Sequence, residues 1–415
     1  MRNRKRRVAI TGFGMISSLG NDTQEVLRSL QQGKSGVEIV EEWKAMGLKS
    51  YVGGTIKDFD LYKAKKSLGG KSRYMDMNAL YCAVAAHEAI AMSGLDAAAI
   101  SSSSMSCIVG NGLSSTDPIV RAGLNVNGHK ASITPFDITR SMSSSCSANL
   151  AYVFGVQGRS YSISSACTTS LHNIGHSYEL IASGLTDMSF TGGGEEVSST
   201  IAALFNGMRS ALATLPEGAD PATLSRPYDQ SRNGFVVSGG GGIVILEAME
   251  HALERGATIY GEIIGYGVSS DGHDIIQPHP EGDGAYRCMK EALESAAIDA
   301  GDIEYINTHG TSTVLGDAAE IQAVRRLIGD KTPISSTKAL SGHGIGAAGV
   351  HELIHCLLMM NNGFLAGSAH IEHLDPEFEG MNILTANIET EANIMMTNNF
   401  GFGGTNASMI IKKYN

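Results

Sequence analysis

The sequence predicts a layered α/β protein. Short apolar runs bounded by glycine or serine alternate with longer stretches of helical pattern, and this alternation is typical of layered α/β folds. Apolar runs without polar alternation suit strands that are covered on both faces. Glycine makes up 50 of the 415 residues without a collagen-like repeat, which indicates many tight turns and close approaches of the backbone.

Eight apolar runs are the predicted strands, and the clearest helical patterns lie between them. The strands are expected at residues 7–14, 106–112, 161–166, 188–195, 241–247, 260–267, 303–310 and 406–413. The helical patterns cover residues 75–95 and 285–302, and the second ends in a glycine stop signal.

A segment near the start of the chain recurs after its middle. I-T-G-F-G-M-I-S-S at residues 10–18 returns as I-I-G-Y-G-V-S-S at residues 263–270. Glycine-rich strand ends repeat by chance in such a chain, but a duplicated domain explains the echo better. The predicted halves are residues 1–255 and 256–415, which share one core because no proline- or serine-rich linker separates them.

Composition excludes several classes of function. The net charge of −11 argues against general nucleic-acid binding, which needs a basic field. No stretch approaches the roughly 20 apolar residues of a membrane helix. The 6 cysteines are scattered without a C-x-x-C pair, so we expect reduced thiols and a soluble, cytoplasmic protein.

Two glycine motifs suggest nucleotide binding only weakly. Gly12-Phe13-Gly14 follows a strand, but Ser17 stands where the dinucleotide fingerprint needs its third glycine. Gly70-Lys71-Ser72 lacks the first glycine of a P-loop, since Lys65 occupies that position. Both motifs are interpreted as structural turns.

Residues 351–355 spell a literal H-E-x-x-H. On a helix, His351 and His355 would share one face and bind zinc, with Glu352 as the general base of a peptidase. The segment is very apolar and directly follows a dense glycine motif. We therefore expect no metal here, and stoichiometric zinc in active protein would overturn that expectation.

Cys167 is the candidate nucleophile. A β-rich run stops at Ser164-Ser165 and a helical pattern begins just after it, which places Cys167 at or beside a helix N-terminus. Backbone N–H groups there stabilise a thiolate, so a lowered thiol pKa is expected. The same groups can hold an oxyanion after sulfur attacks a carbonyl. The alternative is a small buried cysteine that only packs.

Three segments of the second half carry further candidate chemistry. His309 ends a predicted strand, and Lys338 and His343 lie on a strand-to-helix passage. Residues 399–407 form a glycine-rich turn between two apolar runs. Two histidines and a lysine at strand ends can stabilise a negatively charged intermediate.

With these residues together, the chain resembles the β-ketoacyl-[acyl carrier protein] synthases of the condensing-enzyme family, closest to the bacterial synthase I branch. The motifs that carry the resemblance are SSACTTS, NTHGTSTVLGDAAE, STKALSGHGIGAAG and NFGFGGTNA, and it covers nearly the whole chain. It implies the thiolase-like fold, with duplicated α/β halves in five layers (αβαβα), and a homodimer. The implied reaction is a decarboxylative Claisen condensation of malonyl carrier protein with an acyl chain held on Cys167, which elongates fatty acids by two carbons.

The resemblance also implies roles for individual residues. Cys167 matches the nucleophile, His309 and His343 the histidine pair, and Lys338 the lysine before the second histidine. The N–H groups of Cys167 and Phe402 match the oxyanion hole. Glu320 matches an acidic partner of the lysine, and Glu352 a buried acid beside a structural monovalent cation near Asn307 and Asn398. No other cofactor is implied, because the substrates arrive on the phosphopantetheine of acyl carrier protein.

Substrate contacts follow from the same resemblance. Thr311 and Thr313 match positions on the pantetheine arm, Phe400 and Phe402 guard the pocket, and Phe205 lines the acyl tunnel. A basic cluster within eleven residues is the expected docking site for the acidic carrier protein; it consists of Lys63, Lys65, Lys66, Lys71 and Arg73.

Other readings stay open beside the synthase. A condensing-fold partner without catalysis would lack the nucleophile, whereas Cys167 is present. A biosynthetic thiolase would need a second cysteine near the C-terminus, but none follows Cys356. A synthase of the third type pairs its cysteine with histidine and asparagine, whereas here the second partner is His343. The zinc peptidase is the remaining enzyme of another class.

Overall fold

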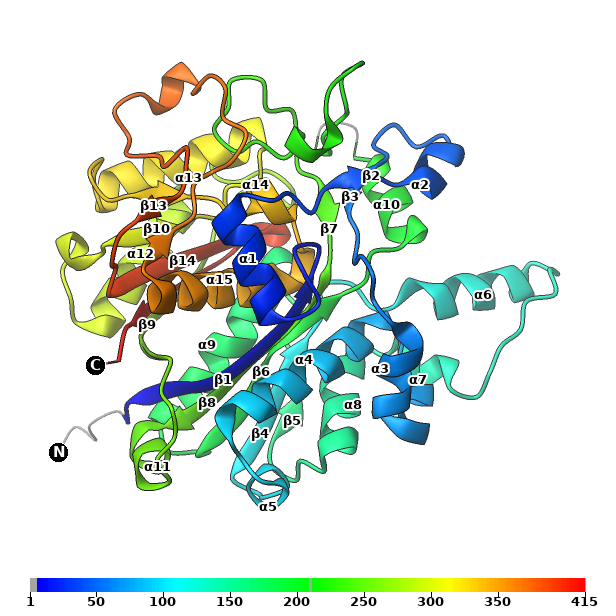
Figure 1. The fold of residues 1–415 in the computed structure, drawn as a ribbon. Coiled ribbons are helices and arrows are strands. Elements are labelled where there is room, and N and C mark those ends of the chain that lie inside the picture. Colours follow the sequence, from blue (N-terminus) through cyan, green and yellow to red (C-terminus); the bar gives the residue numbers. More distant parts are fainter. Residues whose placement is uncertain (1–5, 209–210, 415) are drawn as a thin grey trace.

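The centre of the molecule is one ten-stranded sheet (Figure 1). The computed structural model describes residues 6–208 and 211–414. Five neighbouring strands come from the first part of the chain: β1 (Val8–Ser17), β4 (Met105–Gly110), β5 (Ser160–Tyr161), β6 (Met188–Glu195) and β8 (Gly240–Ala248). The other five are β9 (Gly261–Ser270), β10 (Tyr305–Asn307), β11 (Ile334–Ser335), β14 (Ile394–Gly401) and β15 (Thr405–Lys412).

Both sets of five strands have the same topology. Counted along the chain, each set lies in the spatial order first, fifth, fourth, second, third. In each set the fifth strand is antiparallel to both neighbours and the second is parallel to both. β1 and β9, which carry the repeated segment, pair with each other and join the sets. This repetition is the duplicated α/β architecture that the sequence predicts; the boundary at residue 255 stays a prediction.

Each set of five strands forms one layer, and helices cover both faces of each set. Because the middle helices are shared by the two sets, the molecule has five layers in the order α-β-α-β-α. The outer helices of the first set are α4 (Met77–Ser93) and α8 (Ser145–Phe154), and those of the second are α12 (Asp283–Ala296) and α13 (Val314–Leu327). Two helices, α9 (Thr169–Ala182) and α15 (Ala348–Asn362), lie between the sets and contact each other and strands of both (Figure 1).

The middle helix α15 carries the H-E-x-x-H segment. Every residue from Ala348 to Met360 is buried, and Gly363 ends the helix in the left-handed conformation at φ 68°. A helix that is buried all round belongs to the core of the protein. Its two histidines are therefore enclosed by protein rather than presented to solvent.

The remaining elements surround this body. They are α1 (Thr23–Gln32), β2 (Glu38–Ile39), α2 (Glu41–Ala45), β3 (Val52–Gly54), α3 (Leu61–Ser67), α5 (Ala97–Ile100), α6 (Thr116–Val126), α7 (Asp137–Ser141), α10 (Ser199–Asn206), β7 (Val237–Ser238), α11 (Met249–Glu254), α14 (Lys338–Ser341), β12 (Phe364–Leu365) and β13 (Ile388–Glu389), with short 3-10 turns between them. Helix α6 and the loop after it project from the body (Figure 1). In the described ranges, no helix combines the length and apolar character that crossing a membrane requires.

Each of the eight predicted strands overlaps an observed strand, but two are much shorter than expected. β10 has only the three residues Tyr305–Asn307. The run at residues 161–166 forms only the end of the two-residue strand β5. Beyond it, side chains take over the backbone hydrogen bonds: Asn173 Oδ1 accepts from the N–H of Ile163, and Thr169 Oγ1 from that of Ser165. The chain thereby leaves the sheet just before Cys167.

We expect the Gly175→Ala variant to lose about 1–3 kcal/mol of unfolding free energy, the usual cost of overpacking. A β-carbon at Gly175 on α9 would lie 2.0 Å from Cζ of Tyr266 on β9. Because α9 and β9 belong to different halves of the chain, neither can move away cheaply. Urea unfolding measures the loss.

Gly123→Ala on α6 is the matched control. A β-carbon at Gly123 would meet nothing within 4 Å, so alanine should leave the free energy of unfolding unchanged or raise it by up to about 1 kcal/mol. Equal losses in the two variants would contradict the packing argument.

Candidate active site

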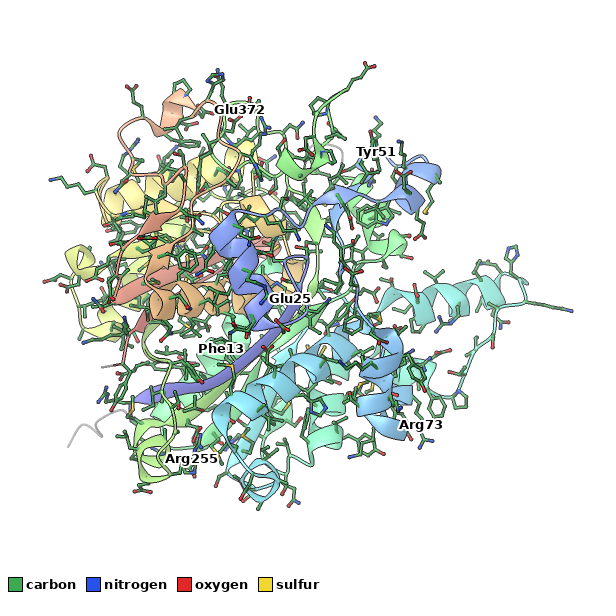
Figure 2. The ribbon with its side chains drawn as sticks, viewed as in Figure 1. Phe13, Glu25, Tyr51, Arg73, Arg255 and Glu372 are labelled. Carbon is green, nitrogen blue, oxygen red and sulfur yellow. The ribbon has the colours of Figure 1, made fainter. Side chains whose placement is uncertain are left out.

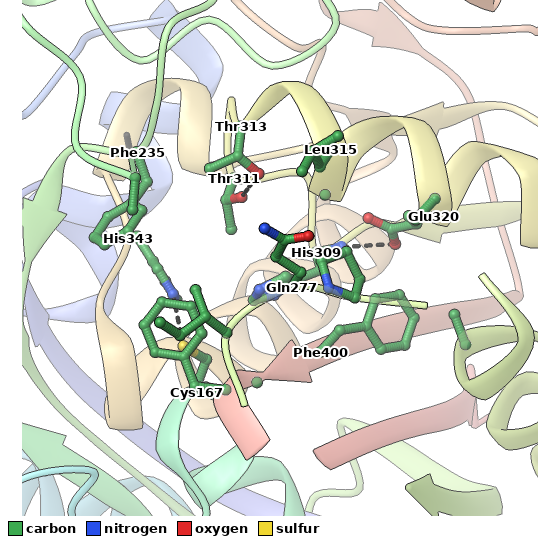
Figure 3. Close-up of a pocket in the computed structure, with 18 of the residues that line it drawn as sticks. Cys167, Phe235, Gln277, His309, Thr311, Thr313, Leu315, Glu320, His343 and Phe400 are labelled. Atoms are coloured by element: carbon green, nitrogen blue, oxygen red, sulfur yellow. Dashed lines mark hydrogen bonds between the residues drawn. The ribbon is translucent and has the colours of Figure 1, made fainter. Parts of the chain in front are cut away.

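Three turns at the ends of strands and helices bring the predicted reactive side chains together. Cys167 lies in a 3-10 turn (Ala166–Thr168) directly before α9, His309 follows β10, and His343 follows α14. All three line a pocket of about 420 Å³ (Figure 3). The structure therefore unites residues that are far apart in the sequence.

The sulfur of Cys167 is in hydrogen-bond contact with one histidine. His343 Nε2 lies 3.0 Å from Cys167 Sγ (Figure 3). The rings of His309 and His343 meet edge to face, with centroids 5.2 Å apart and planes at 86°. A thiol with a base in contact and a second imidazole beside them is the geometry of nucleophilic catalysis.

The turns that hold these side chains are strained. Ala166, Ser312 and Ile345 have positive φ values of 51°, 72° and 49°, a region that costs energy for residues with a β-carbon. Each lies within three residues of Cys167, His309 or His343. Such strain persists where the surrounding structure determines the backbone and is common at functional sites.

The expected lowering of the thiol pKa is wrong for this structure. Burial raises the pKa of Cys167 to about 12, although the Lys338 ammonium and the N–H groups of Phe402 and Cys167 act in the opposite direction. The position before a helix was predicted correctly, but the burial of the thiol raises its pKa by more than the surrounding groups lower it. The resting group is a thiol, so a base must take its proton before the sulfur can attack a substrate.

The two histidines are neutral. Burial first, and then the Lys338 ammonium, hold the pKa of each well below its usual range. A neutral imidazole has one nitrogen that accepts and one that donates. For His343, the nitrogen in contact with Cys167 can accept the thiol proton.

The proton of His309 is assigned by its neighbours. Its Nδ1 faces two donors, Lys338 Nζ at 3.3 Å and Asn399 Nδ2 at 3.4 Å. An ammonium has no lone pair, and Asn399 Nδ2 also donates to Glu352 Oε2 at 2.7 Å. Nδ1 of His309 is therefore the acceptor, and Nε2, on the pocket side, carries the proton.

The acidic partner of Lys338 is Glu352, not Glu320. Lys338 Nζ forms an ion pair with Glu352 Oε1, and both side chains are buried. Glu320 instead accepts the backbone N–H groups of His309 and Gly310, each at 2.8 Å. It thereby orients the His309 turn, while Glu352 balances the charge of the lysine.

The substrate-contact candidates lie in the same pocket as the three reactive side chains. Thr311, Thr313, Phe400, Phe402 and Phe205 all line the pocket. The two threonine hydroxyls are 3.0 Å apart (Figure 3). The edge of Phe400 packs against His309, with ring centroids 5.9 Å apart.

Two residues of the site were not among the predicted ones. Phe235 packs between Phe205 and His343, with centroid distances of 5.5 and 5.4 Å, and Asn399 bridges Glu352 and His309. Asn399 falls inside NFGFGGTNA, and Phe235 falls inside the rest of the chain that the resemblance also covers. The segments were visible in the sequence, but which side chain points into the site was not.

The predicted basic cluster lies outside the pocket, on α3 and the 3-10 turn after it (Figure 2 labels Arg73). Lys63, Lys65 and Lys66 are exposed on α3. Lys71 donates to the carbonyls of Tyr152 and Val153, and Arg73 stacks on Tyr74 and Phe136. Lys66 Nζ also lies 5.9 Å from the centroid of the Tyr62 ring, but Tyr62 is itself exposed, so the three lysines of α3 stay open to solvent.

The cation proposed from the resemblance fits a set of oxygens that differs from the predicted one. Asn307 Oδ1, Thr397 Oγ1 and Asn399 Oδ1 are buried without a hydrogen-bond partner. Asn307 and Thr397 pair across β10 and β14, and Asn399 is two residues further along β14, so the three share one face of the sheet. Asn398 points to the opposite face and contacts Glu320 and Ser408, so Asn399 takes its place beside Glu352.

His351 and His355 do not form a metal site with Glu352. Glu352 is engaged by Lys338 and Asn399, and His355 Nδ1 contacts Thr337 Oγ1 at 3.0 Å. Within residues 6–208 and 211–414, only Cys167, His309 and His343 bring three metal-ligating atoms together. The H-E-x-x-H spelling is part of the core packing.

Family models match both parts of the chain. The model described as "Beta-ketoacyl synthase, N-terminal domain" matches residues 5–252, and "Beta-ketoacyl synthase, C-terminal domain" matches residues 260–372.

Individual proteins match over nearly the full length. The chain is 46% identical to 3-oxoacyl-[acyl-carrier-protein] synthase 1 of Haemophilus influenzae, across 99% of this chain and 100% of the relative. It is 44% identical to the protein of that name in Escherichia coli, across 98% and 99%. A crystal structure of a β-ketoacyl synthase from Burkholderia phymatum superimposes with a TM-score of 0.92 at 32% identity, covering 99% of this chain and 100% of that one.

Proposed function

The chain belongs to the β-ketoacyl synthase family, and we propose that its pocket carries out both steps of that family's condensation. It is an acyltransferase, a β-ketoacyl-[acyl carrier protein] synthase of type I that elongates fatty acids by two carbons. The observation that carries the assignment of residues is the contact of 3.0 Å between Cys167 Sγ and His343 Nε2.

In the first step, Cys167 attacks the thioester of an acyl carrier protein. Because the raised pKa keeps the resting group a thiol, its proton passes to His343 Nε2 as the sulfur–carbon bond forms. The carrier's sulfur leaves and takes that proton. The products are an S-acyl enzyme and a free carrier thiol, which splits one difficult condensation into two easier steps.

The oxyanion of this step is held by backbone groups. The N–H groups of Cys167 and Phe402 lie near the sulfur of Cys167, where both act to lower its pKa. When the carbonyl carbon bonds to that sulfur, its oxygen can receive the same donors. Neither donor needs to move, because one lies in the turn before α9 and the other in the turn after β14.

In the second step, malonyl carrier protein enters and loses CO₂. The carbon–carbon bond to the carboxylate breaks, and its electron pair forms an enolate on the thioester. His309 Nε2–H is held ready to donate to that oxygen, because Nδ1 is committed as an acceptor. His343 is not a donor in this step, because its Nε2 has passed the thiol proton to the carrier's sulfur and its remaining proton is on Nδ1.

The enolate carbon then attacks the acyl group on Cys167. A carbon–carbon bond forms, the bond to sulfur breaks, and the thiolate recovers one proton from solvent. Lys338 transfers no proton in this scheme; its ammonium, paired with Glu352, biases the site towards negative intermediates. Thr311 and Thr313 hold the pantetheine arm, Phe400 and Phe402 close the pocket, and Phe205 lines the acyl end.

A condensation assay tests the proposal. Purified protein is mixed with acyl and malonyl carrier proteins, and the product is resolved by mass. The expected product is a β-ketoacyl carrier protein two carbons longer, formed with one CO₂. CO₂ release without chain extension, or no reaction by folded protein, would contradict it.

We further propose that the acidic carrier protein docks on the exposed lysines of α3. Replacing Lys63 and Lys66 with glutamate should raise KM for carrier-linked substrate about tenfold at low salt and leave kcat unchanged, because rim charges act on encounter. The same acyl group on free pantetheine should be unaffected. Lys331→Glu, at an exposed lysine of the second half, is the control, and equal KM values in all variants would contradict docking on α3.

A homodimer is the proposed assembly. The arm formed by α6 and α7 exposes large apolar side chains, including Val126 at 87% and Ile138 at 71%, which a second copy would cover. Sedimentation should give twice the mass of 43.7 kDa, and a monomer at micromolar concentration would contradict this.

Two smaller proposals concern the surroundings of the reaction. A monovalent cation would be held by Asn307, Thr397 and Asn399, where it would add fixed positive charge. A loss of stability when the protein is exchanged into a buffer with a bulky organic cation tests this.

The cytoplasm is the proposed location, supported by six free cysteines, and fractionation of cells tests it.

A further inference from the structure

The reactive centre has the donor set of a zinc site. Cys167 Sγ and one ring nitrogen each of His309 and His343 lie within 4.8 Å of one another. One thiolate and two imidazoles are ligands that zinc prefers, and sites with three protein ligands keep an open fourth position. Here that position would face the pocket. Zinc bound there would displace the thiol proton and block acylation.

The groups behind His309 oppose such binding. A histidine that ligates metal through Nε2 carries its proton on Nδ1 and donates it to a carboxylate or carbonyl. Nδ1 of His309 faces two donors instead, Lys338 Nζ at 3.3 Å and Asn399 Nδ2 at 3.4 Å. The lone pair needed for the metal is thus on the wrong nitrogen.

The orientation of both donors is itself secured. Lys338 is held by the ion pair with Glu352, and Asn399 Nδ2 donates to the second oxygen of the same carboxylate at 2.7 Å. All three side chains are buried. Rotating His309 or the Asn399 amide to suit a metal would therefore break a buried hydrogen bond.

We propose that Lys338 and Asn399 keep zinc and similar soft divalent cations out of the reactive centre by holding the proton of His309 on Nε2. Two ligands, Cys167 and His343, then remain for a metal instead of three. This role goes beyond the proposed condensation and does not depend on it, because it concerns binding of a metal rather than turnover.

Lys338→Met tests the proposal by removing one donor with little change in volume. His309 Nδ1 then faces one donor instead of two, so its lone pair is held less firmly and the proton can move from Nε2 to Nδ1. We expect the affinity for Zn²⁺ to rise at least about tenfold, the usual effect of an outer partner. Competition with a chromophoric chelator measures it, and Co²⁺ should add a sulfur-to-metal charge-transfer band in the variant.

Controls separate this site from other thiols and charges. Lys331→Met removes an exposed lysine and should leave the affinity unchanged, while Cys167→Ala combined with Lys338→Met should lose both binding and the Co²⁺ band. Asn399→Ser keeps the ion pair and replaces an amide donor with a hydroxyl that can accept. This variant should also raise the affinity for Zn²⁺, so it tests the proposal even if Lys338→Met does not fold.

Two results would overturn the proposal. One is wild-type protein that binds Zn²⁺ as tightly as Lys338→Met and shows the same Co²⁺ band. The other is a folded Lys338→Met or Asn399→Ser variant with no gain over wild type. Because the readouts are binding and absorption, either result leaves the condensation assay unaffected.

Discussion

Replacing His343 with alanine is expected to slow transfer of an acyl group to Cys167 by about 10²- to 10⁴-fold, the contribution of a positioned base. Burial raises the pKa of the Cys167 thiol to about 12, so few molecules hold a thiolate at neutral pH. His343 Nε2, at 3.0 Å, is the base in contact with the sulfur. Single-turnover acylation followed by intact-protein mass measures the rate.

His309→Ala is the matched control in the same pocket. His309 is oriented as a donor, and the base in hydrogen-bond contact with the sulfur is His343, so loss of His309 should spare acylation. It should instead slow decarboxylation and condensation by about 10²- to 10³-fold, the usual effect of one oxyanion donor. If both variants slow acylation equally, the division of roles between the histidines is wrong.

The pH dependence of acylation gives a second check. Because burial holds the pKa of His343 well below its usual range, the ring stays neutral as pH falls through about 6.5, where an exposed histidine would gain a proton. We expect no inflection of the acylation rate there. A loss of rate centred near pH 6.5 would show that His343 titrates like an exposed group.

Glu352→Ala is expected to lower the free energy of unfolding by about 3–5 kcal/mol, the cost of leaving one member of a buried pair alone. Lys338 and Glu352 are both buried, and Glu352 also accepts from Asn399. Removing the carboxylate leaves the buried ammonium without a counter-charge, and leaves the ammonium and the Asn399 amide with only His309 Nδ1 to share as an acceptor. Urea unfolding at pH 7 measures the change.

A double variant distinguishes the ion pair from simple packing. Lys338→Met combined with Glu352→Leu removes both charges and keeps most of the volume, so it should recover most of the lost stability. It should remain impaired in condensation. A loss below about 1 kcal/mol in Glu352→Ala, or no recovery in the double variant, would contradict the account of this pair.

The reactive residues could be predicted because each lies in a local pattern. Cys167, His309 and His343 each lie at a glycine- or serine-rich turn after a strand-like or helical run. The repeated segment likewise marked β1 and β9, which join the two sets of strands. These signals depend on neighbours in sequence, so a single chain displays them.

The electrostatics of the site could not be predicted in the same way. The pairing of Lys338 with Glu352 joins two helices across a turn, and no spacing rule selects Glu352 over Glu320. The helix N-terminus at Cys167 is visible in the sequence, but the burial that raises its pKa depends on segments more than a hundred residues away. The choice of Asn399 over Asn398 depends on which face of β14 each side chain occupies.

The central claim is that Cys167 carries the acyl chain. Intact-protein mass spectrometry of the enzyme mixed with acyl carrier proteins of several chain lengths tests it most directly, with Cys167→Ala beside the wild type. The account predicts one acyl adduct per chain in the wild type and none in the variant. An adduct of the same mass on folded Cys167→Ala, or none on folded wild type at any chain length, would contradict it.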